Sequence, residues 1–131
     1  MVDLFANDVT FAALRKAQQG LGERSRLIAQ NIANVNTPNY HRRDVNFTDE
    51  IAAALDATRG STRAERSAAV LDTVAEEVVE ERLFYRPDMG GVDIDREMAE
   101  FAKTTMLNQA AGQLLGKKIR QYRLVIKDGR V

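Results

Sequence analysis

Residues 94–127, IDREMAEFAKTTMLNQAAGQLLGKKIRQYRLVIK, carry the longest regular pattern in the sequence, and this pattern decides the fold. Spacings of four and three residues alternate there without a break, through Ile94, Met98, Phe101, Thr105, Asn108, Gly112, Leu115, Ile119, Tyr122 and Ile126. This alternation puts the side chains on one side of an α-helix. The sequence therefore predicts a long helix from about Asp93 to Lys127.

The charges at the two ends of this stretch agree with a helix. Asp93 or Asp95 is expected to cap the start, and Glu97 and Glu100 bring negative charge to the positive end of the helix dipole. Gly129 is a plausible stop. The opposite end carries five cations: Lys117, Lys118, Arg120, Arg123 and Lys127.

The centre of the pattern is small or polar, with Thr105, Asn108 and Gly112. Small side chains let a neighbouring backbone come close, and a single asparagine at a core position fixes the register of helix pairing. The alternative interpretation is that the centre simply packs poorly.

A second long helix is predicted upstream, from about Asp8 to Asn34. Its apolar stripe repeats every seven residues and includes Leu14, Leu21, Ile28 and Val35, with Ile32 at an intervening position. Asn7 or Asp8 is expected to cap its start. Pro38 disfavours helical dihedral angles at the residue before it, so this helix must end at or before Asn36.

The two terminal helices are expected to pair as a coiled coil, parallel or antiparallel. The second helix has few large apolar side chains for the number of residues that it orders. We therefore expect both helices to be only marginally stable in the isolated chain. They should become firmly ordered when helices of other copies or other proteins cover them. The predicted packing interface comprises Leu14, Leu21, Ile28, Ile32, Ile94, Met98, Phe101, Leu115, Ile119, Tyr122 and Ile126.

The middle of the chain is less regular. Residues 48–57, TDEIAAALDA, predict a short helix capped by Thr48, and residues 58–62 predict a linker. A weak helix is possible over Arg63–Glu77, and Val78–Tyr85 favours an extended stretch before Pro87.

The predicted fold is therefore mainly α, with an irregular central segment that contains a short helix and an extended stretch. We expect residues 1–36 and 93–131 to form one discontinuous domain of terminal helices. The turn and the central segment occupy residues 37–92.

Composition excludes several kinds of chemistry. The 131 residues contain no cysteine and one histidine, which excludes disulfides, thiolate zinc sites, cysteine nucleophiles and multi-histidine metal sites. No nucleophile stands beside a base, and Gly20-Leu21-Gly22 lies inside a helical pattern, not in a phosphate-binding loop. We predict no enzyme activity, no cofactor and no metal site.

Charge is balanced overall but uneven along the chain. The chain has 19 basic and 19 acidic residues, yet residues 61–100 carry five bases against eleven acids and residues 101–131 carry seven bases against one acid. Pairing between these two regions is expected, within one chain or between copies. The neutral total gives no attraction to nucleic acid, and the uncharged run 104–116 is too polar and too short for membrane insertion. Acids at Asp3 and Asp8 argue against a cleavable secretory signal.

Two possible binding sites, one for calcium and one for phosphate, have less support than ordinary structural roles for the same residues. Asp93, Asp95 and Glu97 alternate like calcium ligands, but the glycine and the distant glutamate of such a loop are missing, and acids suit a first helical turn. His41, Arg42 and Arg43 are able to contact phosphate, but three basic residues after a turn are more often a solvated or interface patch.

The helix stop itself, NIANVNTPNY at residues 31–40, has the chemistry of a β-turn. Pro38 presets φ at the second position of a turn over residues 37–40, and Asn39 tolerates positive φ at the third. Asn34 and Asn36 are able to bond loose backbone groups at the helix end. From the residues alone, an ordinary helix stop explains this segment.

This segment resembles the ANxxTPGY signature of the flagellar basal-body rod and hook proteins. The matching residues are Ala33, Asn34, Thr37, Pro38 and Tyr40, with Asn39 in place of the usual glycine. The continuation HRRDVNF and a carboxyl-terminal block are similar to proximal rod members of this family. That block comprises Tyr85, Arg86, Pro87, Asp88, Gly91, Val92, Asp93, Asp95, Arg96, Glu97, Phe101, Ala102 and Gln109.

The resemblance implies a structural role in the bacterial flagellum. Such proteins are exported unfolded by the flagellar type III apparatus and assemble in the periplasm, where their terminal helices form the inner tube of the rod that transmits motor torque to the hook. The implied partners are copies of the chain itself, other proximal rod proteins, the adaptor protein at the rod base and the membrane-ring protein. The alternative is a free-standing helical adaptor or export-chaperone-like module.

Overall fold

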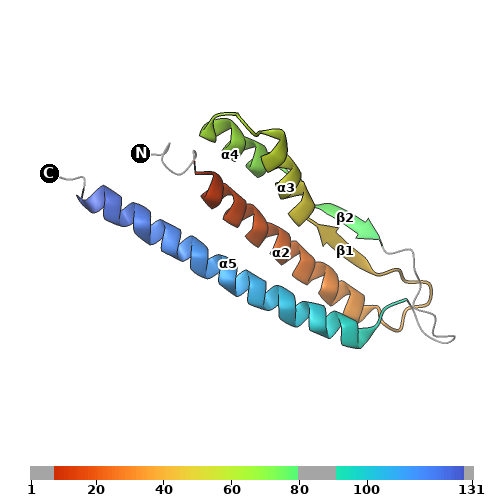
Figure 1. Cartoon of the computed structure of the whole chain (residues 1–131). Coiled ribbons are helices and arrows are strands. Elements are labelled where there is room, and N and C mark those ends of the chain that lie inside the picture. The colour runs from red at the N-terminus through yellow and green to blue at the C-terminus, as the bar shows by residue number, and fades with distance from the viewer. Residues whose placement is uncertain (1–7, 80–90, 129–131) are drawn as a thin grey trace.

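Two long helices that run in opposite directions form the body of the molecule (Figure 1). The computed structural model describes residues 8–79 and 91–128. Helix α2 spans Val9–Ala33 and helix α5 spans Ile94–Asp128. The mainly helical fold with long helices near both ends is confirmed, and their side-by-side packing is antiparallel.

Helix α2 is closed at both ends by side chains that the sequence predicted. The Asp8 carboxylate accepts hydrogen bonds from the backbone N–H groups of Thr10 (2.8 Å) and Phe11 (3.1 Å). At the other end, Asn34 Nδ2 donates to the carbonyl of Gln30 at 2.8 Å. The exposed backbone groups of both termini thus find local partners.

Helix α5 begins at Ile94 because Asp93 caps it. Asp93 Oδ1 accepts hydrogen bonds from the backbone N–H groups of Asp95 (3.0 Å) and Arg96 (3.4 Å). Of the two predicted caps, Asp93 is therefore the one used, and Asp95 lies in the first turn. The helix continues through its small, polar centre without a break.

Between the long helices, two consecutive short helices are flanked by two short strands. Strand β1 (Arg43–Asn46) pairs antiparallel with strand β2 (Glu76–Val79), and Arg43 lies opposite Val79. Helix α3 (Thr48–Ala57) has the predicted bounds, and helix α4 (Arg63–Asp72) is opened by a capping box between Thr62 and Glu65.

The structure corrects the sequence-based bounds in this segment. The helix predicted to continue to Glu77 ends at Asp72, since Thr73 is extended with ψ of 138°. The extended stretch predicted from Val78 begins two residues earlier, where pairing with β1 fixes it. The pairing partner itself, β1, was not predicted.

Parts of the sequence analysis fall outside the described residues. These are Asn7 as an alternative cap, Gly129 as a helix stop, the extended stretch beyond Val79, and residues 85–88 of the block similar to rod proteins.

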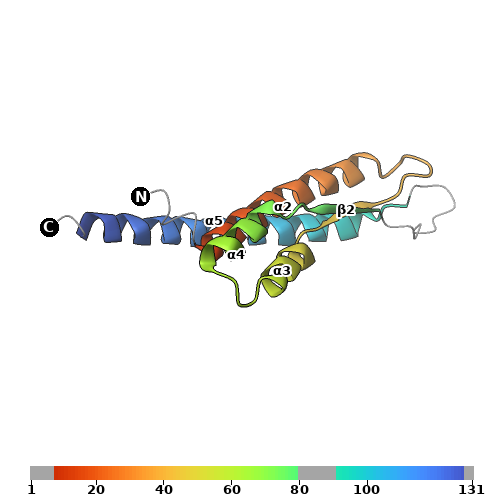
Figure 2. The ribbon, with the colours of Figure 1, turned by 90° about the horizontal axis from the view of Figure 1, so that it is seen from above.

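Helix α2 is the centre of the fold. Helix α5 packs along one side of it, while α3, α4 and the strand pair cover the other side (Figures 1 and 2). Half of the buried apolar side chains of the described residues come from α2: Ala12, Leu21, Leu27 and Ile28, joined by Val45, Val70, Val92 and Ala111. Of the described elements, only α2 packs along α5, so most of the surface of α5 faces outward.

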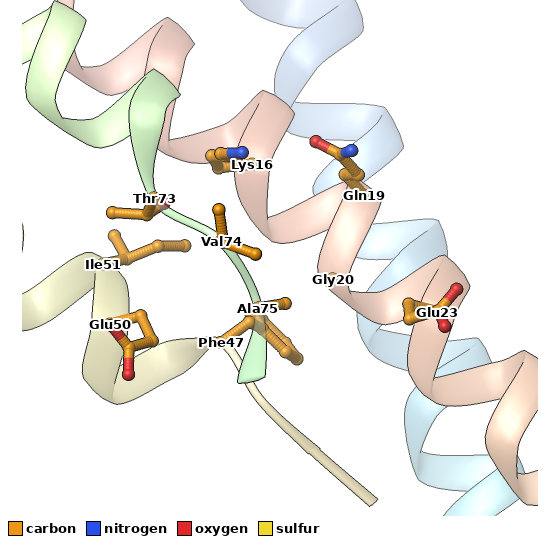
Figure 3. A pocket seen from close by; sticks show the side chains of 10 residues that line it. All are labelled: Lys16, Gln19, Gly20, Glu23, Phe47, Glu50, Ile51, Thr73, Val74 and Ala75. Atoms are coloured by element: carbon orange, nitrogen blue, oxygen red, sulfur yellow. The ribbon is translucent and has the colours of Figure 1, made fainter. Parts of the chain in front are cut away.

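Thr48 does not cap α3, contrary to the prediction. It is the first helical residue, and Phe47 stands at the cap position with no side-chain hydrogen bond to the helix. The Phe47 ring instead packs on the backbone of α2 at Gly20 (Figure 3).

This contact gives a stability prediction with a matched control. A Cβ added at Gly20 would lie 2.7 Å from Phe47 Cδ2, whereas a Cβ at Gly22 meets nothing within 4 Å. Gly20→Ala is therefore expected to lower the free energy of unfolding by about 1–3 kcal/mol through overpacking. Gly22→Ala should raise it by about 0.5–1 kcal/mol, because alanine is the better helix former. Urea unfolding followed by circular dichroism tests both, and equal effects would contradict the close contact.

In residues 8–79 and 91–128, the structure contains no helix that combines the length and the apolar character needed to span a bilayer.

Candidate functional site

The segment after α2 forms the predicted turn. The backbone N–H of Tyr40 donates to the carbonyl of Thr37 at 3.3 Å, and Asn39 has φ of 59°. Pro38 thus takes the second position of the turn and Asn39 the third, where positive φ is required. The N–H of Thr37 donates to the carbonyl of Asn34 at 2.9 Å, which joins the turn directly to the helix end.

The conformation of Asn39 predicts a residue-specific effect on stability. Asn39→Gly is expected to leave the free energy of unfolding unchanged or slightly higher, because glycine adopts positive φ freely. Asn39→Val should lower it by about 1–2 kcal/mol, because a β-branched residue is strained there. Thermal unfolding checks both variants. Asn36→Val, at an exposed site with negative φ, is the control, and an equal loss there would refute the interpretation.

A cluster of polar side chains, here called the polar clasp, joins the turn to the start of α5. It links α2, the segment around β1 and the first turns of α5. Its members are Arg24, Asn31, Arg42, Asp44, Glu97 and Glu100.

Asn31 is the fully buried centre of the clasp. Its Nδ2 donates to the carbonyl of Arg43 (2.8 Å) and to Glu97 Oε2 (3.0 Å). Its Oδ1 accepts from the backbone N–H of Arg43 (3.0 Å) and from the Tyr40 hydroxyl (3.1 Å). One amide side chain thus holds the turn, the segment that leads into β1 and α5 together.

Two arginines neutralise the carboxylates of the clasp. Arg42 Nε donates to Glu97 Oε1 at 2.5 Å, and Arg42 Nη2 donates to Asp44 Oδ2 at 3.0 Å. Arg24 binds both oxygens of Asp44, at 3.0 and 3.1 Å, and also Glu100 at 3.2 Å. The side chain of Glu97 is fully buried and that of Arg42 is 7% exposed.

Burial opposes charge on these groups, but their contacts outweigh it. Desolvation alone would lower the pKa of Arg42, yet the hydrogen bond and charge of Glu97 raise it. Desolvation would likewise raise the pKa of Asp44, but the Val45 backbone N–H and Arg24 lower it. These contacts therefore favour the charged forms of Arg42 and Asp44 within an internally paired network. Such a network orients chain segments and offers no free acid or base.

Metal and small-molecule chemistry find little support in the described ranges. No group of three or more His, Cys, Asp or Glu side chains there is placed to hold a metal ion. A pocket of about 340 Å³ lies between α2, α3 and residues 73–75 (Figure 3). Its wall combines apolar side chains with polar ones: Phe47, Ile51 and Val74 with Lys16, Gln19, Glu23, Glu50 and Thr73.

At the opposite end of the helix pair, Asp8 meets α5. The Tyr122 hydroxyl donates to Asp8 Oδ2, and Lys118 Nζ lies 2.9 Å from the same oxygen. Burial alone would raise the pKa of Asp8, but the bonds from Tyr122 and Lys118 lower it from 3.8 to about 2. Burial, together with the hydrogen bond to Asp8, raises the pKa of Tyr122 to about 12.

These shifts predict how the stability of this corner depends on pH. The Asp8 contribution is complete above pH 3.8 and is lost as the pH falls toward about 2. The Tyr122 contribution is complete below pH 10 and is lost as the pH rises toward about 12. Asp8→Asn should flatten the acid limb of a plot of melting temperature against pH, and Tyr122→Phe the alkaline limb. Asp72→Asn, at an exposed site, is the control, and unchanged limbs in the first two variants would contradict the assignment.

The predicted packing residues fall into three groups in the structure. Leu21 and Ile28 are buried in the core around α2. Leu14, Ile32, Leu115, Ile119, Tyr122 and Ile126 are half-buried. Ile94, Met98 and Phe101 are exposed by 45%, 54% and 41%.

The side chains of α5 that are buried in the monomer differ from this prediction. Glu97, Thr104 and Ala111 are buried, each one position before Met98, Thr105 and Gly112 of the predicted stripe. Large apolar side chains remain exposed around the rest of α5: Ile94, Met98, Phe101, Met106, Leu107, Leu114, Leu124 and Val125. The buried line of α5 thus consists of polar or small side chains, while its large apolar side chains are half-buried or exposed.

The residues of the flagellar signature lie on and beside the turn. Ala33, Thr37, Pro38 and Asn39 are exposed, and Asn34 is half-buried. Tyr40 is half-buried and reaches the polar clasp through its hydroxyl. The signature therefore links a surface turn to the buried network.

The comparisons with known proteins agree with this geometry. No family model matches the sequence. The chain is 30% identical over 131 aligned residues to the flagellar basal body rod protein FlgB of Salmonella typhimurium, and the alignment covers 90% of this chain and 95% of that protein. It is 30% identical to the FlgB of Escherichia coli, with the same coverage, and 27% identical to that of Bacillus subtilis, over 92% of this chain and 95% of the relative.

These alignments cover about nine tenths of the chain. The family resemblance predicted from residues 33–40 is therefore confirmed. The chain belongs to the FlgB family of flagellar basal body rod proteins.

Proposed function

We propose that this chain is a structural subunit of the proximal rod of the flagellar basal body. Membership of the FlgB family supports a rod subunit. The observation that carries the finer proposal is the outer surface of α5, where large apolar side chains are left uncovered by the chain itself. Apolar surface of this extent on a subunit marks an interaction site.

Five of the eight large apolar residues exposed on the described part of α5 form two lines that flank its contact with α2. One line contains Ile94, Met98 and Phe101, and the other contains Leu107 and Leu114, as the helical repeat of 3.6 residues dictates. Two open lines on one helix suit neighbours on two sides, as in a closed tube of helices. We propose that copies of this chain and other proximal rod proteins supply those neighbours.

The contact between α2 and α5 also supports the proposal that the long helices become firmly ordered only on assembly. Thr104 Oγ1 and Asn108 Oδ1 are buried there with no hydrogen-bond partner among the described residues. Each unpaired polar group costs about 1–3 kcal/mol. The packing of α2 on α5 is therefore only weakly stable in the single chain, and contacts with further helices would stabilise it. Low stability before assembly suits a subunit that passes unfolded through the flagellar type III export apparatus and folds in the periplasm.

Within this proposal, residues 1–36 and 93–131 act as one rod-forming unit that transmits torque, and residues 37–92 brace it. The predicted packing interface belongs to that unit. The adaptor protein at the rod base and the membrane-ring protein are proposed as further partners. We assign the chain no catalytic role and no cofactor.

Isolation of basal bodies tests the proposal. Cells that lack the gene should have no rod and no swimming, and an epitope-tagged copy should restore swimming and co-purify with hook–basal bodies. A tagged chain that restores swimming but stays outside washed basal bodies would refute the structural role.

A free-standing helical adaptor is the second candidate, since α2 has a well-buried core of its own. Amide hydrogen exchange separates the two functions. For a rod subunit, we expect fast exchange in α5 of the purified chain and strong protection after assembly with rod partners. Uniformly slow exchange in the purified chain would favour the adaptor.

A further inference from the structure

Strand β2 is the outer strand of the small sheet. Helix α2 packs on β1, whereas β2 lies beyond β1 (Figure 1). All four residues of β2 are exposed, and no other strand of the described chain pairs with it. A two-stranded sheet is only marginally stable by itself, and a further strand stabilises it. The outer edge of β2 is therefore open to an additional strand.

The contacts of β1 show which backbone groups of β2 face outward. The Asn31 amide takes both the N–H and the carbonyl of Arg43, at 3.0 and 2.8 Å, and the N–H of Val45 donates to a side-chain carboxylate at 2.8 Å. Arg43 and Val45 are thus the positions of β1 that do not hydrogen-bond to β2, and they lie opposite Val79 and Glu77. In an antiparallel pair, the backbone groups of such residues point away from the neighbouring strand. The N–H and carbonyl groups of Glu77 and Val79 therefore face outward, and no described residue bonds to them.

The chain around β2 also has exposed apolar side chains. Val74, Val78 and Val79 are exposed by 79%, 47% and 50%. Together with Leu71, they are the exposed large apolar side chains of the described chain outside α5. Valine favours extended backbone, and an open edge with such side chains pairs readily with another strand.

Charge selects which strand this edge accepts. Glu77 lies 3.2 Å from Arg43, and Glu23 is paired with Arg26, so these two acids are neutralised within the chain. The arginines of the polar clasp are bonded to its own carboxylates. Along residues 43–50, 66–79 and the α2 wall of the pocket beside residues 73–75, the charged residues without an ion pair in the described ranges are four acids and two bases: Asp49, Glu50, Asp72 and Glu76, with Lys16 and Arg66. The edge therefore attracts a basic strand.

We propose that β2 accepts an extended segment of another protein as a third, antiparallel strand. In that segment, two β-branched residues lie opposite Val79 and Val78, and the two residues that follow are basic and lie opposite Glu77 and Glu76. Hydrogen bonds to the backbone of Glu77 and Val79 supply affinity, and the side-chain pairs supply specificity. The β2 of a second copy is disfavoured, because it would bring the glutamates of both strands together. This contact uses no residue of α5, so it is independent of the proposed rod function.

Binding of a synthetic peptide to the purified full chain tests the proposal. The probe is a fluorescent peptide in which two valines are followed by two lysines, with threonines on both sides. We expect saturable binding in fluorescence anisotropy. A peptide with glutamates in place of the lysines should bind several-fold more weakly. A peptide N-methylated at the residues that face Glu77 and Val79 should not bind, because it lacks the donors for the new hydrogen bonds.

Hydrogen exchange and two variants locate the contact. The amides of Glu77 and Val79 should exchange more slowly when the peptide is bound, while that of Val78, already bonded to β1, should change little. Val79→Pro removes an outward N–H and keeps the pairing with β1, so it should weaken binding several-fold. Val79→Thr keeps the N–H and is the control. Glu76→Lys should weaken binding of the lysine peptide and strengthen that of the glutamate peptide.

The proposal has definite contrary outcomes. Absence of saturable binding would overturn it, as would binding that N-methylation and Val79→Pro leave unchanged, or protection confined to α5. A dimer of the chain alone that buries β2 and resists the peptide would identify a second copy as the occupant and overturn the basic partner. The rod function is tested separately, because Val79→Pro chains should still enter basal bodies whether or not the peptide binds.

Discussion

Glu97→Ala is expected to lower the free energy of unfolding by about 3–5 kcal/mol, because it leaves the buried guanidinium of Arg42 without its main partner. It also removes an acceptor from the buried amide of Asn31. Urea unfolding followed by circular dichroism measures the loss. Glu23→Ala is the matched control, since it breaks an exposed pair with Arg26 and should cost less than about 1 kcal/mol.

A second variant separates the buried charge from the packing of the clasp. Replacing both Glu97 and Arg42 by leucine removes the two charges together, so it should destabilise the chain less than Glu97→Ala alone. If Glu97→Ala instead cost no more than Glu23→Ala, the clasp would not hold the turn, β1 and α5 together.

Leu107→Glu combined with Leu114→Glu is expected to abolish swimming while the purified chain keeps its helix content. Both side chains are about half exposed in the monomer, at 45% and 50%, so added charge there costs the isolated fold little. In an assembled rod, the same charges would be buried against neighbouring helices without partners. Swimming in soft agar and circular dichroism measure the two effects.

The control for this pair is Gln121→Glu, an exposed polar position on the same helix, which should leave swimming unchanged. Normal swimming in the double variant would show that this line of α5 faces solvent in the rod.

The local features of the fold were predictable from the sequence. Asp8 and Asp93 cap helices through backbone groups two or three residues away, and the turn at Pro38 and Asn39 depends on dihedral preferences of those residues alone. Helical periodicity gave the bounds of α2, α3 and α5 to within a residue or two.

The polar clasp was not predictable in the same way. Arg42 meets Glu97 across 55 residues, and Asn31 meets it across 66. A glutamate in a first helical turn is explained locally by the dipole, so nothing in the sequence indicated that Glu97 is buried. The pairing of β1 with β2 is missed for the same reason, since two helices separate these four-residue strands.

The apolar pattern of α5 shows a different limit. Periodicity identifies residues that need a partner but does not say whether that partner is in the same molecule. Met98 and Phe101 fit the heptad pattern well, yet they are open to solvent in the single chain. In a protein that assembles, selection for the assembled state favours apolar side chains at positions that are exposed in the single chain. The heptad pattern and the burial pattern of the single chain therefore differ.

The antiparallel arrangement of α2 and α5 has a practical consequence for labelling. The start of α2 lies beside Tyr122, near the end of α5, so the first and last described residues of the chain lie at the same pole of the subunit. The bend between α3 and α4 is a better insertion point. Gly60 there has φ of 90°, and residues 59–61 are exposed.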